Sequence, residues 1–300
     1  MKVGVLFPVI ELGGNPDAVR EFGLEVERLN FDHLLMYDHV LGAAHENRDP
    51  PLTQYLDEND PLVDPITSFA YLAGITKKIN FVFGVLVMPQ RQVALVARQL
   101  ADLSLFSGGR VTLGVGSGWN YVEYQALGVD WASRGKILDE QIAILRKLWT
   151  ENLVSFDGKF HQLDRVAVNP RPKTPIPIYI GGDSKVAFRR AARSGDGFIF
   201  MGPIENGLSG LARFREVLAE EGKSDQDFGK HYFMVPVGVD PTQGGQPKSG
   251  FRDVQLVIDE LERWRDAGGT SASISTAGMG FTSVDQHFEV IERVASRLGL

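Results

Sequence analysis

Short apolar segments alternate with amphipathic segments along the whole chain. The apolar segments are rich in Val, Ile, Leu and Phe, as expected of parallel strands that are buried on both faces. Between them, apolar residues recur at steps of three and four, which predicts helices with one buried face. Eight strand–helix units follow one another, with strands expected at residues 2–9, 31–40, 79–88, 111–116, 176–180, 197–201, 232–239 and 271–276.

Local signals support these element boundaries. Asn15-Pro16 and Asp64-Pro65 each place a capping residue before a proline that suits the first helical position. Eight such units in 300 residues are the number required for a (β/α)₈ TIM barrel of the α/β class. We therefore predict a single barrel domain over residues 1–300. A doubly wound open sheet is the alternative, but residues 11–14 match its glycine-rich phosphate turn poorly.

Two stretches exceed what a minimal barrel needs. Residues 42–61, after the second strand, are long, polar and rich in proline. Residues 152–175, between the fourth and fifth strands, predict a hairpin around Asp157-Gly158 and an extended return. We expect both to be insertions, and the first to be a mobile lid or substrate wall.

Charge and cysteine content exclude several classes of protein. Lys and Arg number 31 against 38 Asp and Glu, so the net charge of −7 gives no attraction to nucleic acid or anionic membranes. The lack of cysteine excludes disulfides, thiol nucleophiles and Cys-ligated metals. No apolar run approaches the ~18 residues of a membrane span, and the first run has no signal-peptide cleavage site. We expect a cytoplasmic homodimer that acts on a small molecule.

The carboxyl ends of the strands are where a barrel carries its active site. His39, beside Asp38, follows the second strand and is the sharpest candidate for proton transfer there. The structural alternative is a solvated or capping histidine. With His45 it also suggests a metal site, although two histidines six residues apart in a loop are weak evidence for one.

Two glycine-containing turns suggest a cofactor site. Residues 181–184 (GGDS) open a helix, where free N–H groups receive phosphate, with Ser184 the better side-chain ligand; a plain N-cap is the alternative. Residues 114–118 carry three alternating glycines, followed by Trp119 and Asn120. Such glycines allow close approach of a flat ring, although tight barrel packing explains them equally well.

These residues together resemble the luciferase-like flavin family. The resemblance spans residues 3–200 and rests on MYDHV around His39, GVLVMPQR, SGGR followed by LGVGSGWN, Glu123, Arg134, the helix LDEQIAILRKLW, PIPIYIGGDS and AARSGDGF. It implies a barrel that uses flavin mononucleotide (FMN) or the deazaflavin coenzyme F420. The short chain and Asp38-His39 look more like the F420-dependent branch, with its alcohol, sugar-phosphate and methylene-tetrahydromethanopterin oxidoreductases.

The resemblance also implies roles for residues. His39 and Asn120 would be catalytic, and a bulge with a non-proline cis peptide would lie at Val85 and Leu86 behind the ring. The expected cofactor contacts are Asp38, Val85, Leu86, Ser117, Trp119, Gly181, Gly182, Asp183, Ser184 and Met201. Ser117 replaces the Arg of many FMN enzymes, and the stretch from Met201 lacks the Lys of some F420 enzymes.

The cofactor and the activity therefore have alternatives. We favour F420, whose charged tail would use the cations Lys185, Arg189 and Arg193 along the next helix, unless these form an ordinary solvated face. The alternatives are an FMN-dependent monooxygenase supplied by a separate reductase, a non-catalytic flavin-binding barrel and a metal-dependent barrel hydrolase.

Overall fold

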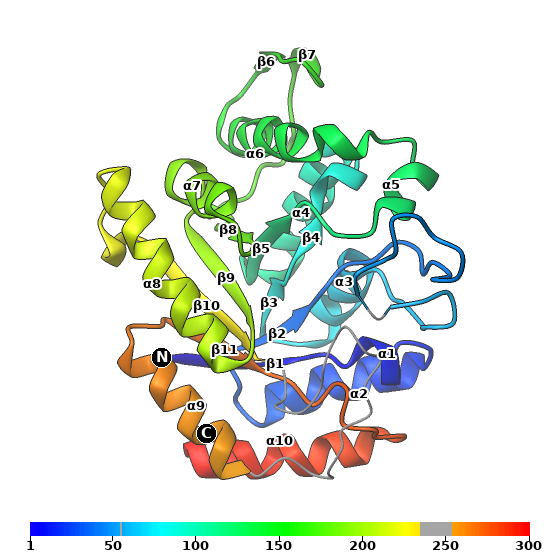
Figure 1. Cartoon of the computed structure of the whole chain (residues 1–300), viewed down its shortest axis with the longest axis vertical. Helices are drawn as coiled ribbons and strands as arrows, with labels where there is room; N and C mark the ends of the chain where they lie inside the picture. The colour runs from blue at the N-terminus through cyan, green and yellow to red at the C-terminus, as the bar shows by residue number, and fades with distance from the viewer. Residues whose placement is uncertain (55, 235–253) are drawn as a thin grey trace.

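Eight parallel strands close into a barrel with helices on its outside (Figure 1). The computed structural model describes residues 1–54, 56–234 and 254–300. Pairing of the first strand with the last and of β3 with β5 closes the sheet, so the predicted TIM barrel is confirmed and an open sheet is wrong. The barrel strands are β1 (Lys2–Leu6), β2 (His33–Met36), β3 (Asn80–Phe83), β5 (Val111–Gly116), β8 (Ile178–Gly181), β9 (Gly197–Gly202), β10 (Gly229–Met234) and β11 (Ser271–Ile274).

The predicted strands lie in the right places, but most of them are longer than the observed strands. The seventh strand begins at Gly229 rather than at residue 232, and its expected end at residues 235–239 lies outside the described residues. The others are shorter than predicted or agree within one or two residues, because apolar residues that continue past a strand pack in the loops.

The helices begin where the capping signals predicted. The Asn15 side chain accepts hydrogen bonds from the N–H groups of Asp17 and Ala18, and Asp64 accepts one from Thr67. The helices are α1 (Val9–Leu12), α2 (Pro16–Arg28), α3 (Pro65–Ile75), α4 (Val93–Ser107), α5 (Tyr121–Ala126), α6 (Arg134–Thr150), α7 (Lys185–Ser194), α8 (Ile204–Glu220), α9 (Val254–Asp266) and α10 (Val284–Leu298).

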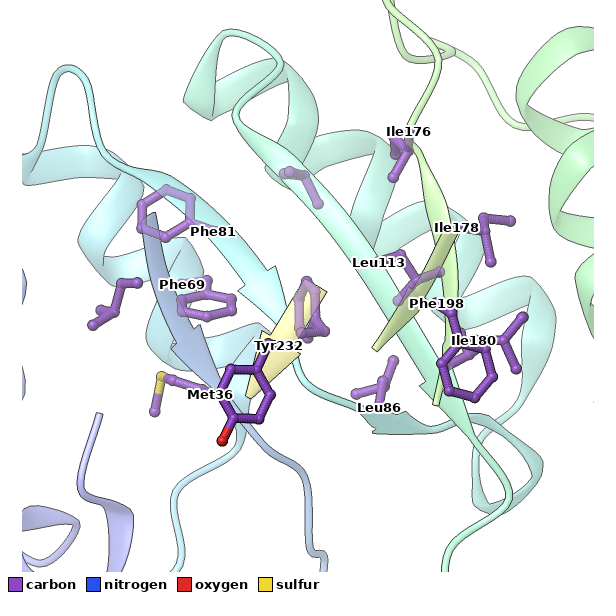
Figure 2. Close-up of a cluster of buried hydrophobic side chains, with 14 of the residues drawn as sticks. Met36, Phe69, Phe81, Leu86, Leu113, Ile176, Ile178, Ile180, Phe198 and Tyr232 are labelled. Carbon is purple, nitrogen blue, oxygen red and sulfur yellow. The ribbon is translucent and has the colours of Figure 1, made fainter. Parts of the chain in front are cut away.

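Two apolar layers hold the barrel together. The outer layer fills the space between strands and helices, and Figure 2 shows part of it, including Phe69, Phe81, Leu113 and Phe198. A smaller cluster fills the barrel interior, since alternate strand residues point inward. Its buried members are Leu6, Leu35, Val82, Ile199 and Phe233.

The two long segments differ in structure. Residues 37–54 and 56–64 form neither helix nor strand, but the loop folds on itself, with His45 Nε2 2.8 Å from the carbonyl of Leu56. The predicted hairpin is confirmed: β6 (Val154–Asp157) pairs antiparallel with β7 (Gln162–Val166), beyond α6 at the top of Figure 1. The carboxylate of Glu140 on α6 anchors it by accepting from the N–H groups of Lys159 and His161.

An irregular segment interrupts the third strand. The chain leaves β3 at Phe83, passes through a cis peptide bond between Gly84 and Val85, and resumes as β4 (Leu86–Val87) beside the end of β5. The expected non-proline cis peptide is therefore confirmed. The interruption carries Val85 to the carboxyl end of the barrel.

Candidate active site

A histidine and a buried carboxylate meet at the carboxyl end of the barrel. His39 follows β2, and Glu123 lies in the first turn of α5, which follows β5. His39 Nδ1 lies 3.2 Å from Glu123 Oε2, and the two side chains are only 10% and 1% exposed. The Trp119 ring packs edge-on against the His39 ring, with their centroids 5.4 Å apart. The barrel thus joins three residues that follow two different strands, β2 and β5.

Glu123 organises the loop that carries His39. Its carboxylate accepts hydrogen bonds from the N–H groups of Val40 (2.7 Å) and Leu41 (3.0 Å) and from Gln90 Nε2 (3.3 Å). Burial by itself raises the pKa of Glu123, but the hydrogen bond and charge of His39 and the two backbone N–H groups outweigh it and lower the pKa. The carboxylate is therefore ionised at neutral pH.

This contact determines which nitrogen of His39 carries hydrogen. An ionised carboxylate only accepts hydrogen bonds, so Nδ1 of His39 must be the protonated nitrogen. In the neutral ring Nε2 then has a free lone pair, as a general base requires. Glu123 is the residue that sequence reasoning undervalued: its position three residues after the Asn120 cap is an ordinary first-turn position for an acid.

The oxygen of the Asn120 side-chain amide is already hydrogen-bonded within the protein. The buried side chain of Asn120 caps α5, with Oδ1 accepting from the N–H groups of Val122 (3.0 Å) and Glu123 (3.4 Å). The side-chain N–H₂ group is therefore the part that suits a ligand. Ser117, three residues earlier, is partly buried, and its carbonyl accepts a 2.6 Å hydrogen bond from the hydroxyl of Tyr124.

Asp38, expected to contact the cofactor, has its carboxylate bonded to other groups of the protein. Both of its oxygens are bonded to Arg91 (3.1 and 2.6 Å), and Oδ2 also accepts from the N–H of Val87 (2.9 Å). Its side chain is fully buried, and Arg91 reaches on to Asp64. These bonds hold β4 beside the end of β2. Leu86, also expected to meet the cofactor, is fully buried in the outer core (Figure 2), so its side chain faces away from the barrel interior.

Glycines around Val85 leave room for its side chain at the barrel mouth. A Cβ on Gly116 or on Gly181 would come within 2.6 Å of the Val85 side chain, so the two glycines flank it. Gly114 and Gly118 similarly face Phe83 and Val87 across the strands. For these three alternating glycines the structure favours the packing explanation. The half-buried Val85 nevertheless presents an apolar side chain at this end of the barrel, packed against the interior cluster.

The start of α7 has the features expected of a phosphate site. Gly182 has a φ of 141°, and Ser184 caps the helix by accepting from the N–H of Ala187 (3.2 Å). Asp183 and Ser184 are exposed, and Met201, at the end of the neighbouring β9, is 60% exposed. Arg213 of α8 reaches the carbonyl of Asp183 at 3.5 Å. This cation lies far away in sequence, which is why no local pattern revealed it.

The cations expected along one face of α7 are all paired with carboxylates. Lys185 and Arg189 both pair with Glu220 (2.6 and 3.1 Å), and Arg193 pairs with Glu221 (2.8 Å). The carboxylates at the end of α8 neutralise this helix face. In the arrangement seen here these cations are matched by anions, and their binding of an anionic cofactor tail stays a prediction.

Residues 1–54, 56–234 and 254–300 contain no group of three or more His, Asp or Glu side chains arranged to hold a metal ion. The second histidine considered for a metal site, His45, directs Nε2 at the Leu56 carbonyl. Within these same ranges no helix has the length and apolar character to cross a membrane.

The fold and the site together define the class of protein: a parallel (β/α)₈ barrel with a histidine–carboxylate pair at the carboxyl end of its strands. The particular family follows from sequence comparison: the family model described as luciferase-like monooxygenase matches residues 1–243. The chain belongs to this family, which confirms the resemblance found in its motifs.

Two curated relatives show the extent of the sequence similarity. The chain is 38% identical over 168 residues to an uncharacterized protein of Mycobacterium tuberculosis (strain ATCC 25618 / H37Rv), covering 56% of this chain and 58% of the relative. It is 32% identical over 203 residues to an F420-dependent glucose-6-phosphate dehydrogenase of Amycolatopsis mediterranei (strain U-32), covering 66% of this chain and 57% of that protein. The matches thus span less than two thirds of either relative.

Solved structures of an F420-dependent dehydrogenase and of a monooxygenase share the fold. An F420-dependent secondary alcohol dehydrogenase in complex with an F420–acetone adduct superposes with a TM-score of 0.77 at 18% identity, covering 98% of this chain and 97% of that one. The monooxygenase RslO1 from Streptomyces bottropensis gives 0.76 at 19% identity, with both chains fully covered. At these identities the likeness establishes the fold alone.

Proposed function

We propose that this protein is an F420-dependent oxidoreductase that transfers a hydride between the deazaflavin and a small organic substrate, with His39 moving the accompanying proton. The observation that carries the proposal is the His39–Glu123 pair at the barrel mouth, at 3.2 Å. The 32% identity to an F420-dependent glucose-6-phosphate dehydrogenase supports the choice of cofactor.

The residues around the mouth fit a flat ring with a phosphate tail. The apolar side chain of Val85 suits contact with a ring face, and Gly116 and Gly181 keep it in place, because a larger residue at either glycine would displace the Val85 side chain. The start of α7, capped by Ser184, suits a phosphate group because it offers N–H donors. Arg213, which reaches the same turn, adds a positive charge. Gly182, Asp183 and the exposed Met201 would line the path between the ring and the phosphate.

The bound deazaflavin would supply the hydride acceptor or donor. When the substrate is an alcohol, its carbon loses a hydride and its oxygen loses a proton. His39 Nε2 takes that proton, and the resulting imidazolium is stabilised by Glu123 on Nδ1. In the reverse direction the same nitrogen returns the proton to the carbonyl oxygen. The Asn120 amide N–H₂ orients the substrate oxygen, and Trp119 limits the movement of the His39 ring.

The deciding experiment is titration of the purified protein with F420 and with FMN, followed by the absorbance and fluorescence of each cofactor. We expect F420 to bind in the micromolar range or tighter and to be reduced by a substrate from a panel of alcohols and sugar phosphates. Tight FMN binding without F420 binding contradicts the proposal and favours the monooxygenase. Bound cofactor without turnover of any alcohol, aldehyde or enone favours a non-catalytic binding protein.

An FMN-dependent monooxygenase is the second candidate. It is favoured by the description of the matching family as luciferase-like monooxygenase and by the short phosphate site, since FMN ends at its phosphate. The ion-paired face of α7 weakens the argument for a long anionic tail along that helix. Oxygen consumption with reduced FMN and a long-chain aldehyde distinguishes this activity from hydride transfer to F420.

A further inference from the structure

The opposite end of the barrel contains a polar chamber of about 330 Å³. It opens where the parallel strands begin, whereas the candidate active site lies where they end. Leu35 and Phe233 follow His33 and His231 by two residues each, so they point into the barrel one layer nearer the active site. That apolar layer separates the two ends. The polar side chains lining the chamber include Lys2, His33, Thr112, Tyr179, His231 and Ser271.

A continuous chain of hydrogen bonds runs along one wall of the chamber. Asp32 Oδ2 lies 3.1 Å from His33 Nδ1, and His33 Nε2 lies 2.8 Å from the hydroxyl of Ser273. The same hydroxyl lies 2.8 Å from His231 Nε2, and His231 Nδ1 lies 3.0 Å from the hydroxyl of Ser271. Both histidines are at least 98% buried, and their ring centroids are 4.9 Å apart.

When both histidines are neutral, the donors and acceptors along this chain of hydrogen bonds can be arranged in one way only. The Asp32 carboxylate accepts, so His33 carries its hydrogen on Nδ1 and accepts the Ser273 hydroxyl at Nε2. Ser273 has only one hydrogen, so His231 must donate to it from Nε2. His231 Nδ1 then accepts the hydroxyl hydrogen of Ser271, whose lone pairs are left facing the chamber.

One added proton reverses the whole chain. With hydrogen on both nitrogens, His33 donates to Ser273, which must turn and donate to His231 Nε2. His231 then carries its hydrogen on Nδ1 and donates it to Ser271. The Ser271 hydroxyl hydrogen is released from His231 and turns toward the chamber.

The geometry favours His33 over His231 as the acceptor of this proton, because His33 has a carboxylate beside one ring nitrogen. Asp32 lies on His33 Nδ1, and burial raises the pKa of Asp32, but the bond and charge of His33 and the charge of Lys2 lower it overall. Burial, and then the nearby His33, holds the pKa of His231 well below its usual value. The titratable or charged groups around His33 and the chamber are Asp32 just before β2, Lys2 from β1, Tyr179 from β8 with Asp196 near it, and His231 from β10.

We propose that this chamber is a proton-linked binding site for a small oxyanion such as a sulfate, phosphate or carboxylate group. Protonation of His33 adds a positive charge and turns Ser271 into a donor. The hydroxyls of Thr112 and Tyr179 and the ammonium of Lys2 line the same space. Burial, followed by the charge of Asp196, raises the pKa of Tyr179, so its hydroxyl stays a donor. In the deprotonated state the lone pairs of Ser271 repel an anion.

Nitrogen-15 NMR of the histidine rings tests the reversal in the unmodified protein. As the pH falls from 8 to about 5, we expect His33 to gain a second hydrogen while His231 stays neutral and moves its hydrogen from Nε2 to Nδ1. Single histidine variants assign the signals. A His231 ring that keeps its tautomer, or that becomes doubly protonated before His33, overturns the proposal.

Calorimetry with sulfate tests binding, because sulfate keeps its charge over this pH range. Where His33 is neutral in the free protein, we expect the affinity for sulfate to fall up to tenfold per pH unit. There each binding event should take up about one proton, which is measured by repeating the titration in buffers of different ionisation enthalpy. Ser271→Ala should weaken binding at pH 5.5 about tenfold. Thr174→Val, which also lines the chamber but lies outside the chain of bonds, should bind normally. Absent or pH-independent sulfate binding overturns the proposal.

Discussion

Two histidine–glutamate pairs in this protein have similar contacts and different surroundings. His39 and Glu123 meet at the barrel mouth, while His161 of the hairpin meets Glu140 of α6 at 3.0 Å. In each pair the carboxylate also accepts backbone N–H groups. Position on the barrel, rather than the pair itself, therefore distinguishes the candidate catalytic residue, and His161 and Glu140 provide matched controls.

Replacing His39 with alanine should reduce turnover by about 10²–10⁴-fold, the usual contribution of a general acid–base group. Cofactor affinity should change little, because the phosphate and ring contacts proposed above do not involve His39. The measurement is steady-state turnover beside cofactor titration. His161→Ala should leave turnover unchanged. Normal turnover with lowered stability in His39→Ala assigns this residue a structural role.

Glu123→Gln should lower kcat/KM by roughly 10²-fold and shift its pH profile, because the amide stabilises the His39 cation poorly. It should also reduce stability by about 1–3 kcal/mol at pH 7. The folded pKa of Glu123 lies below its usual 4.5, so this stabilisation is present above pH 4.5 and is lost as the pH falls through the lowered value. Urea unfolding at several pH values measures the loss.

Glu123→Asp should recover part of the activity, and Glu140→Gln should leave the pH profile intact. Equal pH profiles for Glu123→Gln and the unmodified protein contradict a positioning role for Glu123.

At the level of elements, the buried ion pair of Asp38 and Arg91 ties β4 to the end of β2. Arg91→Ala leaves the Asp38 carboxylate buried without its partner, which should cost about 3–5 kcal/mol of unfolding free energy. Lys147→Ala removes an exposed helical pair with Glu151 and should cost less than ~1 kcal/mol. Denaturant unfolding of both variants provides the comparison. Equal losses would show that burial of the pair is unimportant.

The loop of residues 42–61 is expected to close over bound ligands. Its described part is held by the Tyr121 hydroxyl, which donates to the Pro50 carbonyl at 2.8 Å, and by the contact of His45 with Leu56. Hydrogen exchange of residues 43–54 should slow when cofactor and substrate are both bound. Tyr121→Phe should speed exchange in the free protein. Exchange that is unaffected by ligands argues against a lid.

At the level of the whole molecule, buried neutral histidines make the fold sensitive to acid. His287 is fully buried, with Nδ1 2.8 Å from the Thr276 hydroxyl, and burial lowers its pKa to about 4. The unfolded chain therefore takes up a proton between pH 6.5 and 4 that the folded protein does not. Stability should fall by about 3 kcal/mol across this range because of this residue alone.

Unfolding free energies measured between pH 7 and 4 test this sensitivity. His287→Phe should have the flatter pH dependence, although His231 continues to contribute in the same direction. The same slope in the variant and the unmodified protein would contradict the assignment.

The sequence by itself determined the repeating architecture, and with it the end of the barrel where a site is expected. Alternating apolar runs, helix periodicity and capping residues such as Asn15 are local, so they predict elements without knowledge of their partners. Position after a strand was enough to propose His39, Asn120 and the turn at Gly182 as candidate site residues, which stay predictions. The length of the strands was less accurate, since apolar residues also pack in loops.

Only the tertiary structure decided which polar groups meet. Glu123 on His39, Arg91 on Asp38, Glu220 on Lys185 and the chain from Asp32 to Ser271 all join residues that are distant in sequence or on different strands. A charged residue looks the same in sequence whether it is free or paired. Its partner depends on barrel closure and strand register, which place side chains within hydrogen-bonding distance without leaving a periodic signal in the chain.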